Sequence, residues 1–327
     1  MCRFWRETVL NTPRVWAYFI IRQYYAPSTG ELRLRLHRSR TAPLHIDTRA
    51  AGPNACQKLY DLFSDYHTRI ASLRAQYSSQ CFFQGRDFPC MLLLDLANWY
   101  PVRWDSMPKL QSLRLGAQQW STVPWSELPP LKMLALSRLN CTSVLRHSQS
   151  LTTLMLSNVI LVDAISGPVT FPSLTYLSLS CVTGLKPHVN APRLLTYHES
   201  GIVVGESFNI PLPSLVEYGV YYMLIGSSDP ATWHFAFPNI QRLAIRADEF
   251  VLLPFFDSLA NQPHILPALQ TISTGARGGS TYHITSVAQR KIESLVLARN
   301  EACDVNVMVY FEGVSPFQIP IFFGSGK

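Results

Sequence analysis

The residues with catalytic side chains lack the spacing that a catalytic site requires. His198, Glu199 and Ser200 are contiguous, and a strand would place His198 and Ser200 on one face and Glu199 on the other. A nucleophile and its base must meet in space, which adjacency in the sequence does not ensure. We therefore interpret these residues as polar surface positions. A hydrolase acting through His198 and Ser200 is our third-ranked hypothesis.

The sequence also lacks the common phosphate-binding and metal-binding motifs. The glycine-rich segment 275–279 has no Gly-Lys-Ser/Thr motif, so we interpret it as a flexible loop. The nine histidines include no pair spaced as in His-Glu-x-x-His, and the seven cysteines include no Cys-x-x-Cys. We expect buried, reduced thiols, and neither enzymatic activity, nor a cofactor, nor a metal site.

A repeated hydrophobic motif organises the chain instead. Leu-x-x-Leu-x-Leu begins at Leu110, Leu131, Leu151 and Leu174, usually with a proline two residues upstream. The intervals of 20 to 23 residues are typical of leucine-rich repeats, in which stacked copies share one core. Strand alternation turns the last two leucines of each copy inward. The alternative is a set of unrelated core strands in an α/β protein.

Weaker copies of the motif flank this block. They cover residues 91–96, 194–197, 215–220, 240–245, 269–272 and 292–297. We expect a helix at residues 249–261, a last strand at 305–311 and a cap at 317–323. The ninth repeat position holds Gln118, Leu139, Val159, Val182 and Ile202, so no asparagine ladder can form. The sequence thus predicts an α/β leucine-rich-repeat solenoid, a horseshoe with irregular repeats.

Composition indicates an ordered chain and gives little support for nucleic-acid binding. Hydrophobic residues make up 47% of the 327 residues and charged residues 15%, so the chain can bury a core. Of the net charge of +7, residues 1–50 contribute +6, from nine arginines and three acidic residues. A basic face along the whole solenoid is therefore not expected. Without a signal-peptide core or an apolar run of membrane length, we expect a cytoplasmic or nuclear protein that binds neither nucleic acid nor membrane.

The start of the chain resembles a known family. Residues 2–16 read Cys-Arg-Phe-Trp-Arg-Glu-Thr-Val-Leu-Asn-Thr-Pro-Arg-Val-Trp, with apolar residues at helical spacing that ends before the proline. This stretch resembles the second half of an F-box, as found in the large fungal F-box/leucine-rich-repeat family. Residues 34–46 read Leu-Arg-Leu-His-Arg-Ser-Arg-Thr-Ala-Pro-Leu-His-Ile. They resemble the helix and first strand that follow the F-box, and residues 59–73 resemble the next helix and strand.

The resemblance implies a domain organisation. Residues 1–21 would be a truncated F-box remnant, residues 22–57 a linking helix, first strand and loop, and residues 58–327 the solenoid with its C-terminal cap. We place the loop at residues 47–57. Alternation over residues 32–36 favours a strand, but the resemblance favours a helix, and we follow the resemblance.

The N-terminal half of the F-box, with its Leu-Pro start and Leu-x-x-Ile-Phe helix, is missing from the sequence. In the family that half supplies much of the grip on the adaptor protein. Either the sequence is truncated or ligase coupling has been lost, and both alternatives stay open. The remnant residues that would contact the adaptor are Cys2, Trp5, Arg6, Val9, Pro13 and Trp16.

Outward strand positions between and beside the inward leucines offer a binding surface. In the early copies these positions are small and nearly uncharged, whereas the later ones carry tyrosine, histidine, glutamate and arginine, types that often dominate interfaces. We predict that a partner protein contacts Arg114, Tyr176, His198, Glu217, Tyr221, Arg242 and Arg246. The resemblance implies the substrate-recognition subunit of an SCF-type ubiquitin ligase, with the adaptor, the cullin scaffold and an unknown protein substrate as partners. The alternative is a stand-alone interaction solenoid without ligase coupling.

Overall fold

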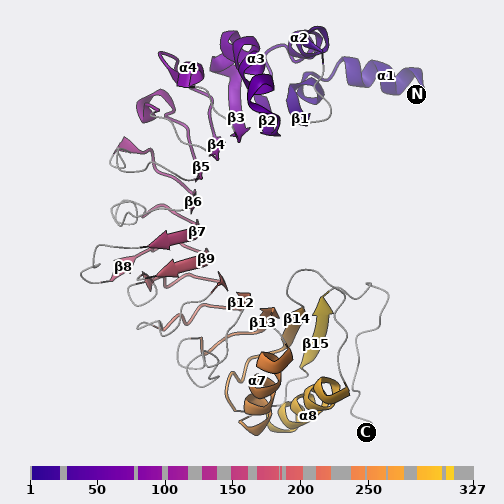
Figure 1. The fold of residues 1–327 in the computed structure, drawn as a ribbon, viewed down its shortest axis with the longest axis vertical. Coiled ribbons are helices and arrows are strands. Elements are labelled where there is room, and N and C mark those ends of the chain that lie inside the picture. The colour runs from indigo at the N-terminus through magenta and orange to yellow at the C-terminus, as the bar shows by residue number, and fades with distance from the viewer. Residues whose placement is uncertain are drawn as a thin grey trace. The chain divides into compact units, whose positions relative to one another are not determined.

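A computed structural model gives the chain as two compact units, residues 1–151 and residues 152–327. In each unit a parallel β-sheet takes one strand from each repeat, as expected for a repeat solenoid (Figure 1). The structure describes residues 2–22, 28–76, 80–97, 102–116, 127–137, 149–160, 168–183, 185, 189–201, 211–221, 237–246, 249–262, 264–275, 286–303 and 307–312.

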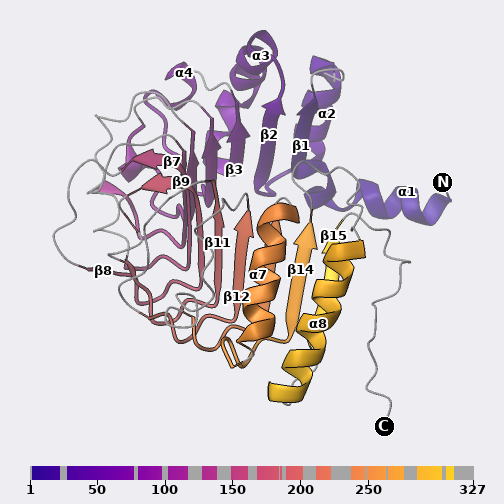
Figure 2. The same cartoon turned by 60° about the horizontal axis from the view of Figure 1, so that its bottom comes forward.

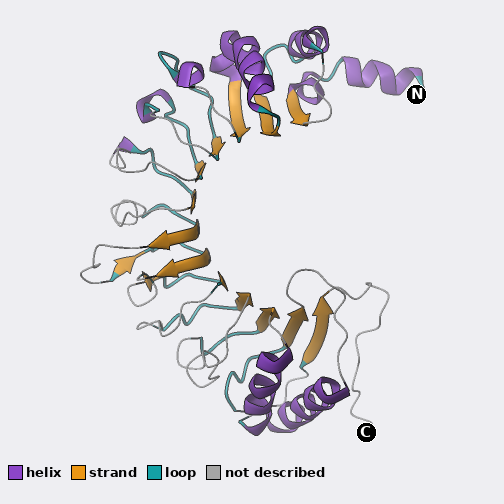
Figure 3. Cartoon of the chain, in the orientation of Figure 1, coloured by secondary structure: helices purple, strands orange, loops and turns teal. Residues whose placement is uncertain are grey.

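In the first unit, strands β1 to β6 pair in chain order, each parallel to the next. Longer helices connect the first strands, and shorter segments connect the later ones (Figures 2 and 3). The elements are α1 (Arg3–Leu10), η1 (Pro13–Ala17), β1 (Tyr18–Arg22), α2 (Thr29–Arg38), β2 (Leu44–Ala50), α3 (Pro53–Phe63), η2 (Ser64–Arg69), β3 (Ile70–Ala75), α4 (Gln80–Phe83), β4 (Leu93–Leu96), η3 (Trp104–Ser106), β5 (Ser112–Leu115) and β6 (Met133–Ser137).

In the second unit, β7, β9 and β11 to β15 form the main parallel sheet, and β8 pairs with β10 in a small second sheet. Helix α7 packs against α8, and Lys291 forms an ion pair with Asp257 between them. The elements are β7 (Thr153–Ile160), β8 (Val169–Thr170), β9 (Tyr176–Thr183), β10 (Val189–Asn190), β11 (Thr196–Ser200), β12 (Glu217–Tyr221), β13 (Arg242–Arg246), α7 (Glu249–Asn261), β14 (Thr271–Gly275), α8 (Ser286–Cys303) and β15 (Met308–Glu312).

Most prolines of the motif lie in a turn that comes just before a strand. Pro172 is the second residue of a turn closed by the Leu174 N–H donating to the carbonyl of Phe171 at 3.3 Å. The same bond joins Leu194 to Ala191 at 3.1 Å. Proline is favoured at this turn position because its fixed φ fits and its missing N–H is not needed. The prediction that proline precedes the strand is confirmed.

The repeated leucines form the core, as the alternation predicts. Those at the first position of the motif, such as Leu110 and Leu174, are buried beneath the strands. The inward pairs are buried in every clear copy, and they are Leu113 and Leu115, Leu134 and Leu136, Leu154 and Leu156, and Leu177 and Leu179. Helix α2 buries Leu32 and Leu36 one turn apart, which confirms the helix that the family resemblance favours. The predicted helix at residues 249–261 and a last strand near 305–311 are also confirmed.

A left-handed residue shifts the phase of three neighbouring strands. Asn158, Cys181 and Gly201 have φ values of 52°, 52° and 78°, and each follows one of three serines paired across β7, β9 and β11. The extra residue turns Val159 and Val182 back into the core. Hence the ninth repeat position is filled there by buried valine. Residues 118, 139, 202 and 317–323 lie outside the described part of the chain.

Three sequence expectations are wrong. Residues 292–297 belong to helix α8, not to a repeat strand. Ile292, Leu295 and Val296 are buried at helical spacing, whereas Leu297 is 56% exposed. Alternation over three residues is too short to separate a strand from a helix.

The expected loop at 47–57 is much shorter. Strand β2 runs to Ala50 and helix α3 begins at Pro53, because proline at the first helical position needs no hydrogen-bond acceptor. The expected first strand, after Pro43, is in fact the second, because Phe19 and Ile21 of β1 already face the core.

Candidate interaction surface

One outward row of the first unit consists of charged residues of alternating sign. Asp47, Arg74, Asp95 and Arg114 are direct register partners on β2, β3, β4 and β5. Neighbouring parallel strands lie about 4.8 Å apart, so each residue of the row lies beside a residue of opposite charge. We call the outward residues of β1 to β6 the first strand face.

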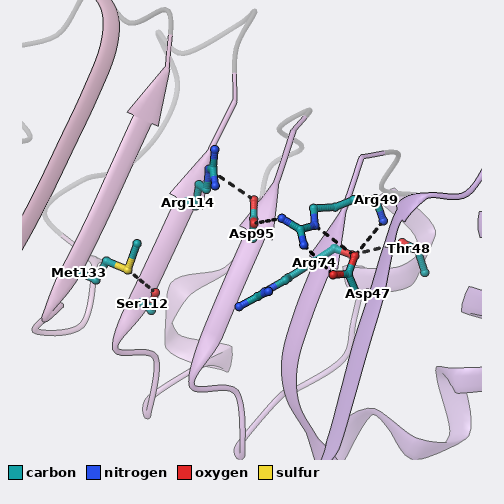
Figure 4. A network of polar contacts seen from close by, with 8 residues as sticks. All are labelled: Asp47, Thr48, Arg49, Arg74, Asp95, Ser112, Arg114 and Met133. Atoms are coloured by element: carbon teal, nitrogen blue, oxygen red, sulfur yellow. Dashed lines mark hydrogen bonds and ion pairs between the residues drawn. The ribbon is translucent and has the colours of Figure 1, made fainter. Parts of the chain in front are cut away.

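Arg49 links the two carboxylates of this row (Figure 4). Its Nε and Nη2 donate to Asp47 at 3.1 and 2.7 Å, and its Nη1 lies 3.7 Å from Asp95. Arg114 is 60% exposed, and its Nε lies 4.0 Å from Asp95. Two-point contact fixes the Asp47 pair firmly, whereas the Arg114 pair is long and open to solvent.

The two carboxylates differ in protonation equilibrium. Partial burial raises the pKa of Asp47, but the hydrogen bonds from Arg49 outweigh it and leave that pKa below its usual value. Burial also raises the pKa of Asp95, and there the more distant Arg114, Arg49 and Arg74 do not compensate fully. The fold therefore stabilises the charged form of Asp47 and disfavours the charged form of Asp95.

A second outward row runs beside the first. The ring of Tyr18 stacks on His45 with centroids 4.5 Å apart, and His45 Nδ1 lies 3.2 Å from the Ser72 hydroxyl. Burial lowers the pKa of His45. Further along, the Ser112 hydroxyl donates to the Met133 sulfur at 3.3 Å, which is a weak acceptor.

We call the outward residues of the main-sheet strands of the second unit the second strand face. On it, side chains form a chain of polar contacts across four strands. The Tyr176 hydroxyl lies 3.3 Å from His198 Nδ1, and His198 Nε2 lies 3.3 Å from Glu217 Oε1. Arg242 Nη2 completes the chain, 3.0 Å from Glu217 Oε2. Because a carboxylate only accepts hydrogen bonds, Nε2 carries a proton, and in the neutral ring Nδ1 accepts the tyrosine hydroxyl.

A glycine makes this chain of contacts possible. His198 pairs in register with Gly219, and a Cβ at Gly219 would lie 2.7 Å from His198 Cδ2. That distance is a clash, so only glycine leaves room for the imidazole to lean over β12. From there His198 reaches Tyr176 on one side and Glu217 on the other.

Glu199 lies on the opposite side of the same strand, as strand alternation predicts. Its two carboxylate oxygens accept hydrogen bonds from the buried Tyr197 and Tyr218, both at 2.5 Å. The two tyrosine rings stack with centroids 5.4 Å apart. Burial raises the pKa of Tyr218, and the neighbouring Glu199 charge raises it further. Ser200 donates its hydroxyl hydrogen to Ser180 at 2.7 Å, so it does not donate to His198.

The N-terminal residues of the F-box resemblance form an exposed helix. No residue of α1 is buried, and Trp5 is 60% exposed. Trp16 follows in η1, where its Nε1 donates to the Val9 carbonyl at 2.8 Å and the Arg38 guanidinium lies over its ring at 4.6 Å. The six predicted adaptor-contacting residues lie together in α1 and η1 or at their ends, and they are Cys2, Trp5, Arg6, Val9, Pro13 and Trp16.

The structure joins four of the predicted partner-binding residues, namely Tyr176, His198, Glu217 and Arg242. Tyr221 and Arg246 pair in register on β12 and β13, but their side chains lie outside the described part. Arg114 belongs to the other unit and contacts Asp95.

Sequence reasoning missed three members of the charged row, Asp47, Arg74 and Asp95. Each occupies the same position between inward residues as Arg114 does. The rule that selected Arg114 would have selected them if the strands before residue 107 had been interpreted in the same way.

Among the described residues, no cluster of His, Cys, Asp or Glu could hold a metal ion. Within the same residues, every helix is too short or too polar to cross a membrane. No protein-family model matches the chain, and no curated protein matches it.

Proposed function

We propose that this chain binds a partner protein through its strand faces and acts as the substrate-recognition subunit of an SCF-type ubiquitin ligase. The polar chain on the second strand face carries the first part of this proposal. There Tyr176, His198, Glu217 and Arg242 contact one another on four strands that are consecutive in the sheet. Side chains already fixed before binding lose less entropy when a partner arrives.

The composition of this surface suits a protein ligand. Tyrosine and arginine are enriched among the residues that dominate protein interfaces. Arg242 is 59% exposed although it contacts Glu217, so its guanidinium can still meet a partner. The row rests on a sheet with a fully buried core, which fixes the spacing between contacts.

The ligase part of the proposal rests on the resemblance of residues 2–46 to the F-box family. The exposed Phe4 and Trp5 on α1 offer an apolar surface for an adaptor. The protein would then perform no bond chemistry, and it would raise the effective concentration of a substrate lysine near the ubiquitin-charged enzyme.

Binding of the purified chain to the purified SCF adaptor tests the ligase part. We expect a dissociation constant of roughly micromolar or tighter, weakened about tenfold or more by Trp5→Ala. Leu34→Ala, an exposed apolar change on α2, is the matched control and should bind normally. No binding by the wild-type chain would favour the stand-alone interaction solenoid.

Quantitative cross-linking in cells tests the recognition part separately. Proteins cross-linked to the wild-type chain should be lost with His198→Ala and with Arg242→Ala. They should be retained with Arg193→Ala, which removes an exposed arginine just before β11. Equal cross-linking by all variants would contradict recognition through this face.

A further inference from the structure

Arg74 is the surplus charge of the first strand face. Asp47 is engaged by Arg49, and Asp95 is shared between Arg49 and Arg114. Within the described residues, no carboxylate lies within 4.0 Å of the Arg74 guanidinium, and the residue is exposed. Figure 4 shows its side chain extending from β3 over β4, the strand that carries Asp95.

Two neighbouring donors on β5 are held only weakly. Arg114 Nε stands 4.0 Å from Asp95 and its side chain is 60% exposed, so it can turn toward a ligand at little cost. The Ser112 hydroxyl donates to a thioether sulfur, and an anionic oxygen is a much stronger acceptor. Arg74, Ser112 and Arg114 therefore present hydrogen-bond donors with weak partners or none, on strands separated only by β4.

We propose that the first strand face binds an acidic segment of a partner polypeptide, with one carboxylate on Arg74 and a second on Arg114 and Ser112. The inference deepens the proposed function, since it names the chemistry of a protein partner, but it does not require ligase coupling. Net charge supports it, because three arginines face two aspartates in this network.

The spacing of the strands specifies the spacing of the acidic residues. Strands β3 and β5 are separated by two strand intervals, or about 10 Å. A polyproline II segment has three residues per turn and rises about 3.1 Å per residue, so residues i and i+3 lie on one side about 9 Å apart. Acidic residues at i and i+3 of such an extended segment match the separation of the two strands that carry the arginines.

Asp95 selects carboxylates over phosphates. Its side chain is 14% exposed and lies between the two arginines in register. A phosphate carries roughly −1.5 to −2 charges at neutral pH, so it meets more repulsion from Asp95 than a carboxylate does.

The test uses a fluorescein-labelled Gly-Glu-Pro-Pro-Glu-Gly peptide and the full chain, with fluorescence anisotropy measured at low ionic strength. We expect binding that weakens with salt. Arg74→Gln and Arg114→Gln should each weaken it about fivefold or more, and the double variant should abolish it. Arg33→Gln, the same change on an exposed position of α2, should bind like the wild-type chain.

Asp95→Asn should strengthen binding, and misfolding of the variant could not produce that result. Removal of the charge between the arginines should tighten binding of the Glu peptide about two- to fivefold. The proposal is overturned if the peptide does not bind, if a Gln-Pro-Pro-Gln peptide binds equally, or if Asp95→Asn weakens binding. A phosphoserine peptide that binds tighter than the Glu peptide would overturn the choice of carboxylate. Failure of adaptor binding alone would leave this result unaffected.

Discussion

On the first strand face, residues paired directly across neighbouring strands carry alternating charges, whereas on the second face both contacts of His198 run diagonally between strands. Thr196 is the register partner of Tyr176 and Glu217, but its side chain is too short to join them. His198, two residues further along the same face, makes both contacts instead. Parallel strands thus carry a row with long ion pairs in one unit and a continuous line of polar contacts in the other.

The difference teaches how each face can meet a partner. The two ion pairs of Asp95 are long and involve exposed arginines, so they are weak and a charged ligand can replace them. On the second face the polar side chains already contact one another, so they present a fixed arrangement. That arrangement favours a ligand of matching shape. We expect binding to the first face to be the more sensitive to salt.

The largest predicted effect is the loss of stability caused by replacing Glu199 in the second unit. The inward row that holds Leu96 and Leu115 in the first unit holds Glu199 in the second, where its register partners are Leu179 and Val220. Its carboxylate accepts hydrogen bonds from two tyrosines of the neighbouring inward row. Glu199→Ala removes one strong hydrogen bond from each of the buried tyrosines Tyr197 and Tyr218. We expect a loss of about 2–3 kcal/mol in the free energy of unfolding, measured by urea denaturation.

Glu217→Ala is the matched control for this prediction, because it removes a carboxylate from the outward side of the next strand. It should cost less than about 1 kcal/mol. Equal losses in the two variants would show that Glu199 is no more important to the fold than a surface carboxylate.

The strands and the core could be predicted from sequence because leucine spacing reports both directly. Of the seven residues predicted to bind a partner, four contact one another, and the partner itself stays a prediction. Their contacts could not be predicted, since they depend on Gly219 being in register with His198. Pairing across strands is not encoded in the local spacing of either residue.

The errors have local causes. Residues 292–297 alternate like a strand over too few positions, and only the longer window of α8 reveals helical burial. The alternation of the strand predicts that Glu199 faces away from His198. Its contact with Tyr218, however, depends on the pairing of β11 with β12. An acidic residue at a core position of a repeat is a signal that could have identified it.

The second prediction compares one glycine in each unit. A Cβ at Gly116 would lie 2.6 Å from the Ala97 carbonyl oxygen, and one at Gly219 would lie 2.7 Å from His198 Cδ2. Backbone cannot move aside as a side chain can, so Gly116→Ala should cost about 2 kcal/mol and Gly219→Ala about 1 kcal/mol. Only Gly219→Ala should change the NMR chemical shifts of the His198 ring, because it displaces the imidazole. Unchanged shifts would contradict the role of Gly219 in positioning the imidazole.

The third prediction is that removing the charge of Asp47 and removing that of Asp95 change the melting temperature in opposite directions. Asp47 has a lowered pKa, so its charge stabilises the fold above its unfolded pKa and that contribution is lost as pH falls. Asp95 has a raised pKa, so its contribution is complete at low pH and is lost as pH rises through the folded pKa. At pH 7, Asp47→Asn should lower the melting temperature and Asp95→Asn should raise it.

Both of these shifts should correspond to no more than about 1 kcal/mol. They should shrink as the pH falls, because a protonated carboxyl group carries no charge, like the Asn amide that replaces it. Differential scanning calorimetry between pH 2 and 7 measures them. Shifts of the same sign at pH 7 would contradict the assignment of one stabilised and one disfavoured anion.

The smallest predicted effect concerns the exposed end of the second face. Arg242→Gln removes a guanidinium that is 59% exposed and pairs with Glu217 at 3.0 Å. Exposed ion pairs contribute little, so the free energy of unfolding should change by less than about 0.5 kcal/mol, as it should for Arg193→Gln. Chemical denaturation of both variants provides the comparison. A selective loss of more than about 1 kcal/mol for Arg242→Gln would mean that this row holds the fold together. A null result, combined with lost cross-linking, would mean that the row is maintained for a partner.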